Sequence, residues 1–222
     1  MLHELLDILV PRRCVVCRAG GRQLCPRCLE ALPRIVPPLC ETCGAGTAWP
    51  VRRCRECHGR RLSFRSARAA VAYDARVRTL VSAWKERGLR LLAADAAAIV
   101  AEVVPKPDVA ALAAVPADGD RGLRRGHDPP LRLAAELARI WDLPLEPLLE
   151  RTRPARPQRG LARHERRANV RGAFRARSRA PPRVAIVDDV YTTGATAAAA
   201  ATALRAAGTG HVEVVTFARA VR

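Results

Sequence analysis

The stretch VAIVDDVYTTGAT, residues 184–196, decides the expected fold. Four apolar residues run into Asp188 and Asp189, and hydroxyl side chains and Gly194 follow before an alanine-rich segment. This order predicts a buried strand over 183–189, then a loop, then a helix that ends at Gly208. In open α/β sheets, ligands bind beyond the carboxyl ends of the strands, so a ligand site is expected at the two aspartates.

The loop TTGAT that follows the aspartates suits an anion. The N–H groups at a helix start, the helix dipole and the threonine hydroxyls favour phosphate, and Gly194 permits close approach of the backbone. The carboxylates would repel phosphate but can accept hydrogen bonds from vicinal hydroxyls, so a sugar phosphate satisfies both halves. Both acids reach one sugar only if the chain turns at Asp189. The alternative is a plain strand–loop–helix with an aspartate helix cap, for which one acid is enough.

Strands and helices alternate through the rest of the chain after residue 60. Strands are expected near 65–73, 108–116 and 211–220 and a further one within 145–152, with helices near 75–88, 89–104 and 131–141. Such alternation predicts an α/β fold with a mostly parallel sheet covered by helices on both faces.

All eight cysteines lie before residue 58, in four Cys-x-x-Cys pairs. Two such pairs complete one tetrahedral zinc site, so the spacing predicts two structural zinc ions. The sequential partition is the simplest, and an interleaved pairing stays open. Disulfides and free thiols are the alternatives, and the lack of a recognisable secretion signal argues against disulfides. The predicted metal ligands are Cys14, Cys17, Cys25, Cys28, Cys40, Cys43, Cys54 and Cys57.

The chain of 222 residues is long enough for one ordinary domain and a small module, which we place at 61–222 and 1–60. Its net charge of +18 points to polyanionic partners, although the dominance of arginine over lysine also fits a GC-rich coding bias. Residues 151–183 hold 12 arginines and one glutamate, Glu165. No apolar run reaches the length of a membrane span, and a cytoplasmic location is expected.

The motif at 184–196 resembles the phosphoribosyl pyrophosphate (PRPP) signature of type I phosphoribosyltransferases. Over nearly the whole chain the sequence is similar to the ComF family of competence-associated, phosphoribosyltransferase-like proteins. This resemblance rests on the cysteine pairs and on four further segments of the chain. They are the stretch from Tyr73 to Gly88 with Lys85, the RRG at 124–126, the segment 151–174 and the ARA at 218–220. The sequence departs from the family at 127–129, where His, Asp and Pro replace an aromatic residue, an amide and a glutamine.

The resemblance implies a type I phosphoribosyltransferase fold with an N-terminal double zinc ribbon. It implies that Asp188 and Asp189 are catalytic and that PRPP is bound together with Mg²⁺. Arg124 and Arg125 would meet pyrophosphate oxygens, and the alternative for them is a solvated loop. The residues expected to bind PRPP are Asp188, Asp189, Thr192, Thr193, Gly194, Ala195, Thr196, Arg124, Arg125 and Lys85.

Three functions remain open at the level of the sequence. The first is a phosphoribosyltransferase that displaces pyrophosphate from PRPP with an acceptor that the sequence does not name. The second is a competence factor that binds single-stranded DNA, and the third is a PRPP-sensing regulator without catalysis. The hypothesised partners are therefore PRPP, single-stranded DNA, the DNA-uptake machinery and a second copy of the chain in a homodimer.

Overall fold

The centre of the fold is a four-stranded parallel sheet. The computed structural model describes residues 12–117, 127–152, 170 and 172–220, and the strand order is β1-β6-β5-β2. Every neighbouring pair is parallel, so the carboxyl ends of all four strands lie at one end of the sheet. The strand bounds are Ser66–Ala72 for β1, Ala111–Ala114 for β2, Arg183–Tyr191 for β5 and His211–Arg219 for β6.

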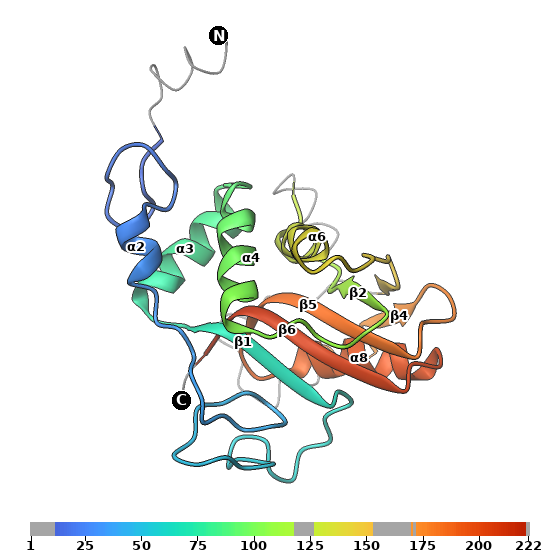
Figure 1. The fold of residues 1–222 in the computed structure, drawn as a ribbon. Coiled ribbons are helices and arrows are strands. Elements are labelled where there is room, and N and C mark those ends of the chain that lie inside the picture. The colour runs from blue at the N-terminus through green and yellow to red at the C-terminus, as the bar shows by residue number, and fades with distance from the viewer. Residues whose placement is uncertain (1–11, 118–126, 153–169, 171, 221–222) are drawn as a thin grey trace.

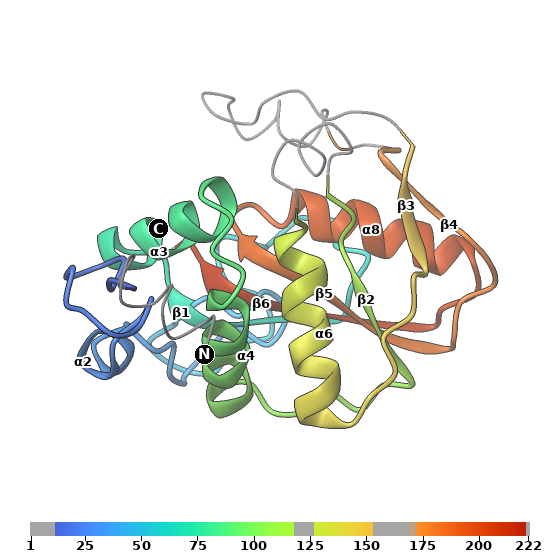
Figure 2. The same cartoon turned by 90° about the horizontal axis from the view of Figure 1, so that it is seen from above.

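Helices cover both faces of this sheet. α3, α4 and α6 lie on one face, and α8 lies on the other (Figure 1). α4 and α6 pack side by side across the sheet (Figure 2). The helix bounds are Ala75–Glu86 for α3, Leu92–Val103 for α4, Pro129–Trp141 for α6 and Ala195–Ala206 for α8. The predicted fold class, a mostly parallel sheet flanked by helices, is confirmed.

Local side chains place the helix ends. The Asp74 carboxylate accepts a hydrogen bond from the Val77 N–H at 2.8 Å where α3 begins, and Asp128 accepts one from Leu131 at 3.2 Å where α6 begins. The predicted stops are confirmed, because α3 ends two residues before Gly88 and α8 ends two residues before Gly208. Within the described ranges, none of the helices has the length and apolar character needed to cross a bilayer.

The side chains of β5 alternate between two hydrophobic clusters. Ala185 and Val187 pack in the cluster with α3, α4 and α6, and Val184 and Ile186 pack in the cluster with α8. Burial on both faces explains the unbroken apolar run. The strand continues through both aspartates to Tyr191, so the turn at Asp189 that the two acids were expected to need is absent. Pairing with β6 sustains it, because Val190 and Tyr191 still lie opposite residues of that strand.

A second, antiparallel sheet of two strands packs against α8. It consists of β3 (Leu149–Arg151) and β4 (Phe174–Ala176). The strand expected within 145–152 is thus present but only three residues long, and Phe174 is buried in the α8 cluster.

The two cysteine groups lie on opposite faces of the sheet. The first group, with the short helix α2 (Pro26–Glu30), packs into the cluster of α3 and α4, and the second packs into the cluster of α8 (Figure 1). The residues between them run along β1: the Ile35 N–H donates to the Ala70 carbonyl at 2.9 Å, and the Ala72 N–H donates to the Pro33 carbonyl at 2.8 Å. This pairing covers an edge strand that would otherwise be open. The domain boundary at residue 60 stays a prediction.

The second cysteine group docks closely on the backbone of β1. The Ala67 N–H donates to the Thr42 carbonyl at 2.9 Å. Gly44 has a φ of +69°, and a Cβ built on it would lie 2.3 Å from the Ala67 carbonyl oxygen. Gly44 is therefore required both for its left-handed backbone and for the space that it leaves.

We predict that Gly44→Ala destabilises the protein much more than Gly59→Ala. Gly59 has a similar φ of +67° but open space around its Cβ position, so its substitution costs only the backbone strain, about 1–2 kcal/mol. Gly44→Ala adds a steric clash of about 1–3 kcal/mol. Denaturant unfolding monitored by circular dichroism gives the two free energies, and equal losses would show that the docking of Gly44 on Ala67 is not tight.

Candidate functional site

The loop predicted to bind an anion joins the carboxyl end of β5 to the first turn of α8. Gly194 begins this helix with a φ of +70°, and a Cβ built on it would lie 2.3 Å from the Tyr191 hydroxyl oxygen. The Tyr191 ring thus packs against the glycine, and only glycine fits at this position of the loop.

Backbone N–H groups at the start of α8 are available to a ligand. The Thr193 hydroxyl accepts a hydrogen bond from the Ala195 N–H at 3.3 Å, and the first bond within the helix runs from the Ala198 N–H to the Gly194 carbonyl at 2.9 Å. The N–H groups of Thr196 and Ala197 therefore have no partner inside the helix. Together with the helix dipole they make this end of α8 attractive to an anion.

Asp189 is buried and forms an ion pair with Lys85 of α3. The residue is 6% exposed, and its carboxylate Oδ1 lies 2.6 Å from the Lys85 Nζ. Burial lowers the pKa of Lys85, but the attraction of Asp189 outweighs this effect and raises the pKa above its usual value. The lysine therefore stays charged, and the structure brings together two residues that are 104 positions apart in the sequence.

Asp188 lies beside this pair in a different environment. Its Oδ1 accepts a hydrogen bond from the Asp189 N–H at 2.8 Å. Burial and the neighbouring Asp189 carboxylate raise the pKa of Asp188 to about 7, although Lys85 acts in the opposite direction. The two carboxylates thus share one lysine, and the raised pKa of Asp188 lies near neutral pH.

Sequence reasoning did not assign a role to His127 or Asp128, where the chain departs from the family pattern. The Asp128 carboxylate accepts from the N–H groups of Leu131 and of Ala117, both at 3.2 Å, and so joins the start of α6 to the residues after β2. His127 is buried, and its Nε2 lies 2.8 Å from the Trp84 carbonyl, next to Lys85. Both residues support the site, and the aspartate before two prolines is a helix-start signal that could have shown this.

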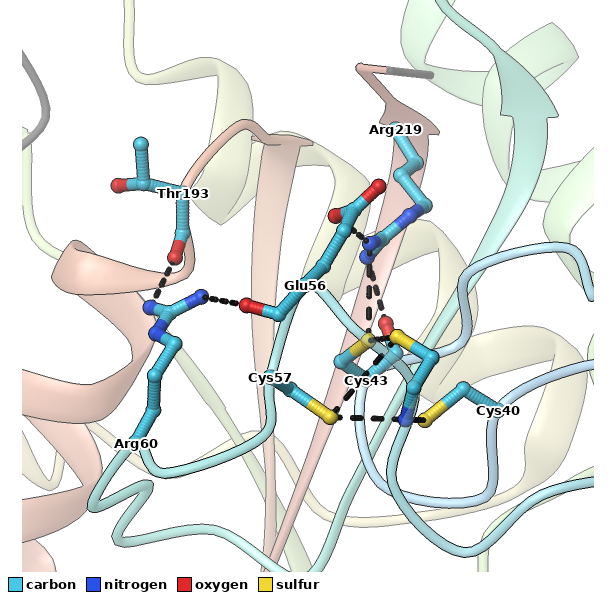
Figure 3. A network of polar contacts seen from close by, with 8 residues as sticks. Cys40, Cys43, Glu56, Cys57, Arg60, Thr193 and Arg219 are labelled. Carbon is cyan, nitrogen blue, oxygen red and sulfur yellow. Dashed lines mark hydrogen bonds and ion pairs between the residues drawn. The ribbon is translucent and has the colours of Figure 1, made fainter.

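Two further arginines were missed by the site prediction. Arg60 contacts the Thr193 carbonyl, and Arg219 of β6 contacts Glu56 and Cys43 of the second cysteine group (Figure 3). Arg219 lies in the ARA that carried the family resemblance. The predicted ligand-binding residues Arg124 and Arg125 lie outside the described part of the chain.

The eight cysteines form two separate groups of four. The sulfur atoms within each group lie within 4.8 Å of one another. The predicted sequential partition is confirmed and the interleaved one is wrong. The first group holds Cys14, Cys17, Cys25 and Cys28, and the second holds Cys40, Cys43, Cys54 and Cys57.

The geometry of these groups fits zinc. A tetrahedral ion with four sulfur ligands at about 2.3 Å places the sulfurs about 3.8 Å apart. The measured Sγ–Sγ distances are 3.6 Å for Cys17 and Cys25, 3.6 Å for Cys40 and Cys57, and 3.5 Å for Cys43 and Cys54. Each group could therefore hold one ion with protein ligands alone, as structural sites do.

The thiols of each group are electrostatically coupled. Burial acts to raise the pKa of Cys14 and of Cys40, but backbone N–H donors outweigh it, so that the pKa falls to about 6 for Cys14 and to about 7 for Cys40. In contrast, burial and neighbouring sulfurs raise the pKa of Cys28 to about 12 and that of Cys57 to about 11. Four thiolates can coexist at this distance only around a cation, which a bound zinc would supply.

Comparison with known proteins agrees with these observations. The double zinc ribbon domain family matches residues 5–58. A relative named Competence protein F, from Haemophilus influenzae, is 36% identical over 115 residues, which are 50% of this chain and 50% of that protein. The chain thus aligns with only about half the length of this relative. The similarity confirms the resemblance to the competence-associated family that the motifs indicated.

Among solved structures, the chain has similarity to an orotate phosphoribosyltransferase from Aeropyrum pernix. The sequence identity is 25%, the TM-score is 0.33, and the match covers 67% of each chain.

We predict two zinc ions per chain in the purified protein. Elemental analysis by mass spectrometry measures this ratio directly. Removal with a chelator should unfold the segments around both groups, because metal binding supplies part of their folding free energy. A zinc-free protein whose circular dichroism spectrum and thermal stability do not change on treatment with the chelator would contradict the assignment.

We also predict that Asp188 makes the wild-type protein lose stability as the pH rises. The pKa of Asp188 is about 7 in the folded state and 3.8 as the ordinary value, so the folded state binds the proton more tightly. The contribution of Asp188 is fully present below about pH 4 and is lost as the pH rises through about 7. The Asp188→Asn variant should therefore lose less stability than the wild type when the pH rises from about 5.5 to about 8.

Denaturant unfolding at these two pH values measures the effect, and the exposed Asp142→Asn serves as the control. The control should keep the pH dependence of the wild type, because its carboxylate is solvated. The same pH dependence in all three proteins would show that the pKa of Asp188 is not raised in the folded protein.

Proposed function

We propose that the chain is a competence-associated, phosphoribosyltransferase-like protein that binds PRPP with Mg²⁺ at the end of β5. One observation carries this proposal: two adjacent carboxylates at the carboxyl end of a parallel strand are followed directly by a glycine-containing loop and a helix N-terminus. Carboxylate acceptors and an anion-binding helix start, side by side, match the ribose hydroxyls and the 5′-phosphate of one ligand.

In this proposal the residues of the loop hold the phosphate. The N–H groups of Thr196 and Ala197 face the ligand at the helix start, and Gly194 allows the backbone to approach closely. The Thr193 hydroxyl already accepts from Ala195, so its remaining role towards phosphate is to donate its proton.

The two aspartates hold the sugar although the chain does not turn at Asp189. The Asp188 carboxylate bends back to accept from the Asp189 N–H, and both carboxylates interact with Lys85, so both border the same space. Their carboxylates accept hydrogen bonds from the ribose hydroxyls, and their negative charge stabilises the positive charge that a ribosyl group develops when pyrophosphate leaves. Lys85 holds the Asp189 carboxylate in place through their ion pair. Mg²⁺ would be held by the phosphates of the ligand and by one or two carboxylates, and it would neutralise the leaving pyrophosphate.

Single-stranded DNA binding is the second candidate function. Trp49 is 68% exposed, and the exposed Arg52 and Arg55 lie near it in the sequence of the second cysteine group. An exposed aromatic ring among arginines suits the stacking of bases together with contact to a phosphate backbone. Salt-sensitive binding of an oligonucleotide that is weakened by Trp49→Ala, with unchanged PRPP affinity, would support this function.

We predict that Asp188→Asn combined with Asp189→Asn abolishes PRPP binding. Each lost hydrogen bond to a charged group costs about 1.5–3 kcal/mol, so the affinity should fall at least about 100-fold. Isothermal titration calorimetry with PRPP and Mg²⁺ measures this loss directly.

The matched control for this measurement is Asp108→Asn combined with Asp142→Asn. It changes the net charge equally, at two exposed carboxylates away from the loop. If the control binds as the wild type does, long-range charge is excluded as the cause. The assignment fails if the double variant at Asp188 and Asp189 keeps the wild-type affinity.

A transferase and a sensor differ in their products. A screen of acceptors for magnesium-dependent pyrophosphate release separates the two, because a sensor binds PRPP without releasing pyrophosphate. Release that depends on one acceptor class would identify the reaction.

A further inference from the structure

The second cysteine group contacts the loop after β5 through Arg60. One guanidinium nitrogen of Arg60 donates to the Thr193 carbonyl, and the other terminal nitrogen lies 3.5 Å from the Glu56 carbonyl (Figure 3). Glu56 belongs to the turn between Cys54 and Cys57. Arg60 therefore bridges a turn that carries two metal ligands and the backbone of the loop.

A second connection runs through Arg219, the last residue of β6. Arg219 is 3% exposed, and its Nη2 lies 2.8 Å from the Glu56 carboxylate and 3.6 Å from the Cys43 sulfur. Its Nη1 donates to the Cys43 carbonyl at 2.5 Å. A buried cation beside a thiolate ligand stabilises the excess negative charge that four thiolates leave around one zinc ion.

Arg219 also reaches the loop after β5. Its guanidinium lies over the Tyr191 ring, 4.7 Å from the centroid, and this ring packs against Gly194. The second cysteine group is thus connected to the loop in two separate ways. Arg60 contacts the Thr193 carbonyl, and Arg219 contacts Tyr191, which packs against Gly194. The first cysteine group packs on the opposite face of the sheet, in the cluster of α3 and α4.

We propose that Arg60 is a positioning residue for the loop 191–196, and that metal at the second cysteine group and a phosphate ligand at this loop strengthen each other's binding. The proposal rests on the function proposed above. The bound metal fixes the turn from Cys54 to Cys57, this turn fixes Arg60 and Arg219, and the two arginines hold the loop in the conformation that the ligand binds. Because coupling between two binding sites is reciprocal, the ligand must raise the affinity for the metal by the same factor by which the metal raises the affinity for the ligand.

The first test compares Arg60→Ala with Arg61→Ala. Both variants remove one positive charge at neighbouring positions, but the hydrogen bond to the Thr193 carbonyl comes from Arg60. In calorimetry with PRPP and Mg²⁺, Arg60→Ala should lose about tenfold in affinity, and Arg61→Ala should stay within about twofold of the wild type. Arg60→Lys keeps the charge and a donor and should recover part of the loss. Equal losses in both alanine variants would leave only an effect of net charge and would overturn the positioning role.

The second test measures the coupling between ligand binding and the second cysteine group at the cysteines themselves. Iodoacetamide labelling followed by mass mapping reports the accessibility of each cysteine. In the wild type, PRPP with Mg²⁺ should slow labelling of Cys40, Cys43, Cys54 and Cys57 by about tenfold and leave the first group unchanged. Arg60→Ala should lose this protection. If PRPP binds but protects neither group, or protects both groups equally, the coupling does not exist.

A third measurement separates failure of this proposal from failure of the proposed function. If the wild type shows no PRPP binding in calorimetry, the proposed function is contradicted. Hydrogen exchange of the ligand-free protein then decides the positioning role. Faster exchange over residues 191–198 in Arg60→Ala than in Arg61→Ala supports it, and the same exchange in both variants contradicts it.

Discussion

The arrangement of one face of the molecule depends on the cost of burying Asp189 at the end of the central strand. A buried carboxylate needs a cation and hydrogen-bond donors. Lys85 supplies the charge, so α3 must lie with its last turn over the carboxyl end of β5. The contact of His127 with the Trp84 carbonyl then ties the start of α6 to the same turn. The pair of acids thus organises the helices above it, and Asp188 remains as the carboxylate with a pKa near neutrality.

The opposite face supports the same loop by different means. There the second cysteine group packs in the same cluster as α8, and Gly44 lets it lie directly on β1. Arg219 and Arg60 connect the second cysteine group to the backbone around Gly194. A cysteine-rich segment of this size has few large apolar side chains, and metal ligation compensates for the small core that it can build. The candidate ligand site therefore lies at the carboxyl end of β5, between the face covered by α3, α4 and α6 and the face covered by α8 and the second cysteine group.

Much of this fold could be predicted from the sequence, because its signals are local. Apolar runs, glycines that end helices and Cys-x-x-Cys spacing predicted most of the strands, the helices and the two metal groups. The contacts that shape the site could not be predicted, because they join distant residues: 104 positions separate Lys85 from Asp189, 133 separate Arg60 from Thr193, and 163 separate Glu56 from Arg219. The absence of a turn at Asp189 could not be predicted for the same reason, since pairing with β6 extends the strand to Tyr191.

The central claim is that the loop after β5 and the two aspartates before it hold a single sugar phosphate. A crystal structure of the protein with PRPP and Mg²⁺ tests this claim most directly. The account predicts that the 5′-phosphate lies on the N–H groups of Thr196 and Ala197 and that the ribose hydroxyls lie on Asp188 and Asp189. Density for PRPP elsewhere on the molecule, with this loop occupied by solvent, would contradict it.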